Sequence, residues 1–160
     1  MTVFFSDSRQ QQIERGEVFF QSHTVQRTVQ NKMCVIEVVA DADWNVEYTL
    51  DLVLDGSWYI QINEFASTAT PAIQYIPINM NRDATNTLNA WYAFRINQTY
   101  APSSNVTAFY VLNGKVPQNS LLNRDTGAIL KKGYKTTITL TNLDPIDRSL
   151  VISQFFRELG

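Results

Sequence analysis

One stretch of the sequence constrains the fold more than any other: from Trp44 to Leu54, apolar and polar residues alternate with a period of two. Successive side chains of an extended strand point to opposite faces, so this pattern predicts a strand with one buried face. Asp55-Gly56 follows and is typical of a hairpin turn. The alternation then resumes at Trp58, Ile60 and Ile62, which predicts a second strand.

The same pattern recurs along most of the chain. In the stretch 134–142, Lys135, Thr137 and Thr139 face away from the apolar positions, which predicts a face that is wet or touches a polar partner. Short strands at regular spacing without amphipathic helices favour an all-β, antiparallel β-sandwich, and a jelly roll is the commonest way to arrange so many strands in two sheets. We expect these further strands at residues 72–79, 90–97, 106–112, 134–142 and 149–156.

The composition limits the partners of the chain. Its 160 residues are enough for one hydrophobic core, and 44% apolar against 18% charged residues argues against disorder. A formal net charge of −2 gives no electrostatic reason to bind nucleic acid. The start, Met1–Phe5, lacks a secretion-signal pattern, and no window approaches eighteen consecutive apolar residues. We expect no nucleic-acid partner, no membrane contact and synthesis without a secretion signal.

Residues 1–32 differ from the rest because they are rich in Gln, Ser and Arg and carry the aromatic pairs Phe4-Phe5 and Phe19-Phe20. One interpretation is a short helix around residues 10–17 that packs on its own domain. The other is an extended N-terminal arm whose phenylalanines dock on a neighbouring subunit, because a segment that orders on binding needs apolar anchors. Both remain open, and we expect an arm at 1–32 and a β-sandwich domain at 33–160.

The residue types needed for catalysis are sparse. A Ser or Cys nucleophile needs a base, and the single histidine, His23, lies in a polar segment, which favours a solvated or interface role. Cys34 lies in an apolar run and is expected to be buried. Asp41 and Asp43 offer too few oxygens for calcium, and Glu64 is the one candidate for a glycosidase carboxylate. The sequence predicts no enzyme, no metal site and no cofactor.

Two stretches carry a family resemblance. In Ile78–Asp83 a strand ends in an Asn-Arg pair. In Ile129–Leu143 a Leu-Lys turn leads into a strand with Tyr and Ile and then Thr-Asn-Leu, and a terminal strand with an aromatic end, Leu150–Phe156, follows. Together they resemble the small jelly-roll decoration, or cement, proteins that coat the outside of tailed-phage capsids.

This resemblance implies a structural virion protein that binds the outer surface of an assembled capsid and staples neighbouring subunits of the major capsid protein. It also implies association with copies of itself as a dimer or trimer, synthesis in the host cytoplasm and a location on the capsid exterior. Repetition over many copies makes modest single contacts sufficient through avidity. Aromatic residues and Arg are enriched in interfaces, so the expected contact residues are Phe4, Phe5, Phe19, Phe20, Arg82 and Arg124.

An alternative is a carbohydrate- or receptor-binding jelly-roll module of a phage tail or spike. Its stacking platforms would be some of four rings that lie on predicted strands, and it requires several of them to be exposed together. These rings are Trp58, Tyr59, Trp91 and Tyr92.

Overall fold

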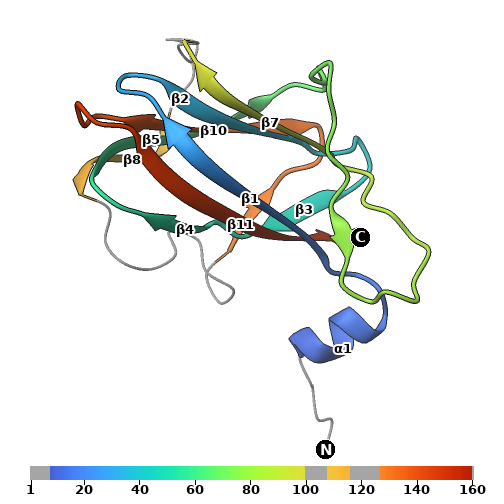
Figure 1. Cartoon of the computed structure of the whole chain (residues 1–160). Helices are drawn as coiled ribbons and strands as arrows, with labels where there is room; N and C mark the ends of the chain where they lie inside the picture. The colour runs from blue at the N-terminus through green and yellow to red at the C-terminus, as the bar shows by residue number, and fades with distance from the viewer. Residues whose placement is uncertain (1–7, 100–107, 116–126, 160) are drawn as a thin grey trace, which may run out of the picture.

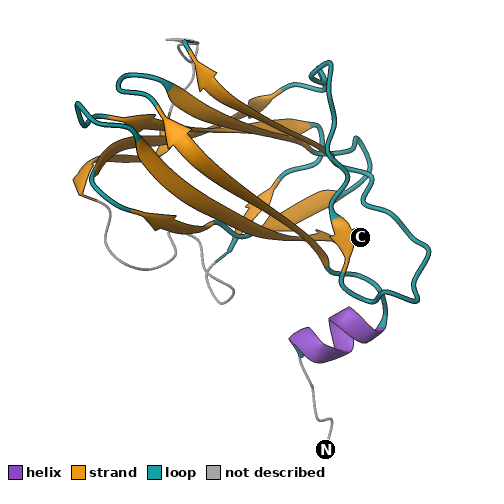
Figure 2. Cartoon of the chain, viewed as in Figure 1, coloured by secondary structure: helices purple, strands orange, loops and turns teal. Residues whose placement is uncertain are grey.

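The computed structural model describes residues 8–99, 108–115 and 127–159. Two layers of strands face each other, and a short helix lies outside them beside the ends of β1 and β11 (Figure 1). Strands account for most of the regular structure (Figure 2). In chain order the elements are α1 (Arg9–Glu14), β1 (Phe19–Thr28), β2 (Met33–Val39), β3 (Asn45–Tyr48), β4 (Asp51–Leu54), β5 (Ser57–Ala66), β6 (Ile78–Asn79), β7 (Trp91–Gln98), β8 (Ala108–Lys115), β9 (Ala128–Leu130), β10 (Tyr134–Asn142) and β11 (Arg148–Leu159).

The described strands form two antiparallel sheets, which confirms the predicted all-β sandwich. The six-stranded sheet has the order β6-β1-β11-β3-β9, with β4 also paired to β11. The five-stranded sheet has the order β7-β2-β10-β5-β8. From β1 to β5 the chain changes sheet at each connection except the one between β3 and β4, which both belong to the six-stranded sheet. The segment between β5 and β8 adds β6 to the edge of one sheet and β7 to the edge of the other.

The core lies between the sheets and uses the alternation seen in the sequence. Val46, Tyr48 and Leu50 are fully buried, as the period-two pattern predicts, whereas Trp44 at the start of the pattern is 40% exposed. Removal of these apolar side chains from water is the main favourable term in folding. The largest fully buried side chains are Trp58, Tyr48, Tyr92 and Phe156.

The predicted strand 44–54 is interrupted in the middle. The Thr49 hydroxyl accepts a hydrogen bond from the Phe155 N–H at 2.9 Å, and the Gln154 side-chain amide donates to the Thr49 carbonyl at 3.0 Å. These side-chain bonds replace regular ladder bonds, so the stretch is divided into β3 and β4. The register with β11 continues unchanged across the break.

Three of the other predicted strands correspond closely to β7, β10 and β11. The predicted strand 106–112 corresponds to β8, although residues 106 and 107 lie outside the described residues. Three strands were not predicted individually: β1, β2 and β9.

The turn at Asp55-Gly56 exists but closes no hairpin, because β4 belongs to the six-stranded sheet and β5 to the five-stranded one. Gly56 has a φ of 87°, and a Cβ there would lie 2.0 Å from Oδ2 of Asp144. That carboxylate accepts from the Ser57 N–H at 2.9 Å and from the Arg148 Nε at 3.0 Å. The turn is therefore fixed to the loop before β11, and only glycine fits it.

The expected boundary at residue 32 needs correction. β1 pairs with β11 along its length, beginning with Phe19 opposite Phe156. Phe19 is only 3% exposed and Val25 only 4%, and both belong to the core. Residues 19–28 are thus part of the sandwich, and only the residues before β1 can act as an arm.

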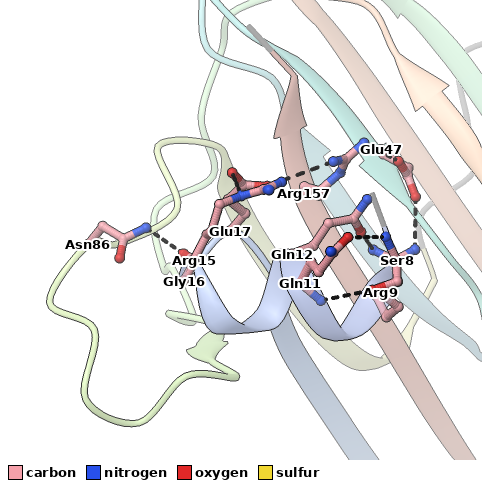
Figure 3. A network of polar contacts seen from close by, with 10 residues as sticks. All are labelled: Ser8, Arg9, Gln11, Gln12, Arg15, Gly16, Glu17, Glu47, Asn86 and Arg157. Atoms are coloured by element: carbon pink, nitrogen blue, oxygen red, sulfur yellow. Dashed lines mark hydrogen bonds and ion pairs between the residues drawn. The ribbon is translucent and has the colours of Figure 1, made fainter. Parts of the chain in front are cut away.

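The helix interpretation is confirmed for residues 9–14. Ser8 caps α1, since its hydroxyl accepts from the Gln11 N–H at 3.1 Å and the Gln11 side chain accepts from the Ser8 N–H at 3.0 Å. Six residues are too few for a stable isolated helix. Glu47 on β3 ties α1 to the sandwich by pairing with Arg9 at 3.0 Å and with Arg157 at 3.4 Å (Figure 3).

The outer face of the five-stranded sheet is less wet than predicted. Thr137 is 6% exposed and Thr139 only 2%. Beside them, Glu37 pairs with Lys135 at 2.8 Å and with Arg95 at 3.1 Å. The centre of this face is thus shielded, and it is not the open polar surface that the alternation suggested.

Gly56→Ala is expected to lower the free energy of unfolding by about 2 kcal/mol, because the new Cβ meets the Asp144 carboxylate in a strained backbone conformation. Gly133→Ala is the matched control, since its φ is 75° but nothing lies within 4 Å of the position that a Cβ would take there. Urea denaturation of both variants measures the difference. Equal losses in the two variants would show that the Asp144 contact is unimportant.

Candidate interaction surface

A segment that we call the strap, residues 73–79, crosses the open side of the sandwich between the edges of the two sheets. Its Tyr75 N–H donates to the Tyr92 carbonyl on β7 at 2.8 Å. Its other end, β6, pairs with Phe19 and Phe20 of β1. The sequence predicted a strand over residues 72–79, but Pro77 has no N–H to donate, so only Ile78–Asn79 pairs as a strand.

The strap exposes large apolar side chains next to one another. Ile73 is 72% exposed, Ile76 68%, Ile78 50% and Tyr75 42%. Single exposed apolar residues are ordinary, whereas a group of them marks a binding surface or an aggregation-prone one. The strap is therefore the most apolar short segment on the described surface.

A groove of about 430 Å³ adjoins the strap, where β1 and β7 face each other across the open side. Residues 21–25 and 28 of β1 pair with β11 on one side, while β6 covers only residues 19 and 20 on the other. Asn97 closes the far end, because its side chain accepts from the Val29 N–H at 3.3 Å and donates to the Arg27 carbonyl at 3.4 Å. The groove is lined by His23, Thr24, Val25, Gln26, Arg27, Tyr75, Phe94, Ile96 and Asn97.

His23 forms part of the groove wall as a member of an aromatic stack. Its ring lies 4.0 Å from the Phe94 ring at an interplanar angle of 14°, and it meets the Tyr75 ring edge-on at 5.1 Å. Its Nε2 is buried and has no hydrogen-bond partner among the described residues. Burial lowers the pKa of His23 below its ordinary value, because the charged imidazolium loses water without gaining a partner. The ring therefore works as a neutral packing surface.

The predicted contact residues that the structure describes differ in their exposure. Phe19 is in the core and cannot reach a partner, which corrects that prediction. Phe20 is half-buried and packs on the Phe155 ring at 5.0 Å. Arg82 is exposed and lines a second hollow of about 290 Å³ together with Ile76 and Ile78 of the strap. Phe4, Phe5 and Arg124 lie outside the described residues.

The four aromatic rings of the carbohydrate alternative do not form one platform. Trp58 and Tyr92 are fully buried. Tyr59 and Trp91 are partly exposed, but the register places Tyr59 opposite Thr141 of β10 and Trp91 level with Lys135 of the same strand. Six residues of strand separate these two levels by about 20 Å. No single sugar ring could stack on both.

The other candidate groups are occupied within the sandwich. Glu64 accepts a hydrogen bond from the Tyr48 hydroxyl at 2.8 Å. Cys34 is buried as predicted, and burial raises the pKa of its thiol to about 11. Within residues 8–99, 108–115 and 127–159, no three His, Cys, Asp or Glu side chains gather as metal ligands. None of the described helices is long and apolar enough to cross a membrane.

Sequence reasoning missed the strap and the groove for different reasons. The strap did carry a local signal, since Pro71 and Pro77 enclose a run of large apolar residues and argue against a central strand. The groove carried none, because His23 and Phe94 come from strands about seventy residues apart in sequence and meet only in the folded chain.

The fold and this surface define a class, an antiparallel β-sandwich with an apolar strap at one open edge. No protein-family model, no curated protein and no solved structure matches the chain. Its function is therefore inferred from the strap, the groove and the order of the strands.

Stability is expected to fall as the pH drops below about 6.5, the ordinary pKa of histidine. The folded state holds the pKa of His23 lower, so the unfolded chain binds the proton first, and stability is lost until the folded pKa is reached.

The His23→Phe variant keeps the stack but cannot titrate. Urea denaturation at pH 7.5 and at pH 5.5 should show a smaller loss of stability in this variant than in the wild-type chain. Equal losses would assign the acid sensitivity to other groups.

Proposed function

We propose that this chain is a structural virion protein that binds the outside of an assembled phage capsid and joins neighbouring subunits of the major capsid protein. The observation that carries the proposal is the strap, with Ile73, Ile76 and Ile78 each at least half exposed. A partner that covers these side chains gains about 1.5–3 kcal/mol for each one that it fully buries. Many copies on one shell would add such contacts through avidity.

The order of the strands supports the jelly-roll part of the proposal. If β3 and β4 are counted as one interrupted strand and β6 and β7 as edge additions, eight strands remain, four in each sheet. The two ends of the chain pair across it, β1 with β11 and β2 with β10. Eight strands in two sheets are the jelly-roll arrangement, which viral capsid proteins use repeatedly.

The groove and the strap also suit a protein partner better than a sugar. They combine apolar side chains with a backbone edge that no described strand pairs. Backbone edges of this kind bind extended protein segments by strand addition. The tail or spike alternative has no comparable support, because its aromatic rings are buried or far apart.

The proposal is tested by replacing one strap residue with a charged one. Ile76→Asp should weaken binding to capsid shells that lack the chain by at least about tenfold, the equivalent of 1.4 kcal/mol. Val53→Asp is the control, because Val53 is 70% exposed on β4, outside the strap, and Ile76 is 68% exposed. Co-sedimentation with purified shells of the phage that encodes the chain measures both.

Two outcomes would contradict the proposal. One is that the wild-type chain stays in the supernatant and is missing from purified virions by mass spectrometry. The other is that the Ile76 and Val53 variants bind equally well.

A further inference from the structure

We infer that the groove between β1 and β7 is a binding site for residues 1–7 of a second copy of this chain, which add to the sandwich as an extended strand. This inference concerns contacts between copies of the chain and does not depend on the capsid proposal.

The backbone edge is the first argument. Beyond Phe20, no described strand pairs with the groove side of β1, and Asn97 occupies only the end at Arg27 and Val29. Residues 21–26 therefore offer an edge about as long as a seven-residue segment. Proteins commonly shield such edges with charge or with a covering segment, because they are templates for pairing with another chain.

The chemistry of the groove is the second argument. Its apolar wall includes Phe94 and Ile96, and Ile96 remains 46% exposed. Arg27 is its one permanently charged side chain, and it forms an ion pair with Asp147. Residues 1–7 carry Val3, Phe4 and Phe5 followed by Asp7. Val3 and Phe5 would point to one side of a strand, toward the apolar wall.

The path of the chain explains why the donor is a second copy. Ser8 begins α1, and α1 is tied to Glu47 on β3. The strand β11 lies between β3 and β1, so the groove edge is about 10 Å away across the sheet.

The distance from Glu47 to the far end of the groove, measured along β1, is larger still. Glu47 is opposite Arg157, level with the start of β1, whereas Arg27 is about 25–30 Å further along it. Seven extended residues reach at most about 25 Å. A chain's own segment therefore cannot extend along its own groove as far as Arg27, whereas the segment of a second copy is not limited in this way.

Exchange of the segment between copies would make the chain self-associate. If two copies insert their segments into each other, a closed dimer results, and a head-to-tail exchange closes as a trimer or larger ring. In either assembly, the straps of several copies belong to one oligomer.

Sedimentation velocity of the full-length protein over a range of concentrations tests the site. Ile96→Asp and Phe5→Asp should each weaken self-association by at least about tenfold relative to the wild-type chain. Ile129→Asp is the matched control, because Ile129 is 57% exposed on β9, away from the groove, and should leave association unchanged. Circular dichroism verifies that every variant is folded.

A disulfide between copies gives a second measurement that does not need a weakened variant. A chain carrying Phe5→Cys is mixed with a chain carrying Ile96→Cys and oxidised, and the mixed dimer should form at least about tenfold faster than with an Ile129→Cys partner. The natural Cys34 is fully buried and does not compete.

Three results would overturn the inference. The first is a wild-type chain that stays monomeric at all concentrations, and the second is equal cross-linking to positions 96 and 129. The third is a chain carrying both Phe5→Cys and Ile96→Cys that cross-links within itself at high dilution, which would show that its own segment reaches the groove. None of these measurements uses capsids, so they stand apart from the test of capsid binding.

Discussion

The six-stranded sheet depends on its central strand, β11. This strand pairs with β1 on one side and with β3 and β4 on the other, and no other described strand joins those two halves. Its inward side chains alternate along its length and are all at most 1% exposed: Leu150, Ile152, Gln154 and Phe156. The last long segment of the chain thus assembles strands that come from its first third, and the interior of the sandwich is complete only when β11 is in place.

The same strand determines where the N-terminal segment leaves the domain. Arg157, near the end of β11, pairs with Glu47 at 3.4 Å and with Glu17 at 3.8 Å, and Glu47 in turn pairs with Arg9 (Figure 3). These charges are about 20–40% exposed, so each pair contributes little alone, and the network positions α1 more than it stabilises the fold. Arg9, at the start of α1, therefore lies on the β3 side of β11, across the sheet from the groove.

Much of the fold could be predicted from the sequence, because a strand with one buried face must alternate. Period-two alternation correctly predicted strand structure for residues 46–54 and for β10. It failed for β1, where a register irregularity between Val25 and Thr28 and a Gln- and Ser-rich composition obscure the period. It also failed at Asp55-Gly56, because a turn motif specifies local backbone geometry and not the sheet that the next strand joins.

The candidate interaction surface could hardly be predicted from the sequence, because it is made by contacts between residues far apart in the chain. His23, Tyr75 and Phe94 come from three separate segments, and only the strap has a local signal, the apolar run between Pro71 and Pro77. The strap covers just the first two residues of β1 and leaves the rest of that edge beside a groove with an apolar wall at Phe94 and Ile96. A sandwich that functions alone would shield such an edge. The open edge next to exposed isoleucines is the surface that the proposed strand addition from a second copy would cover.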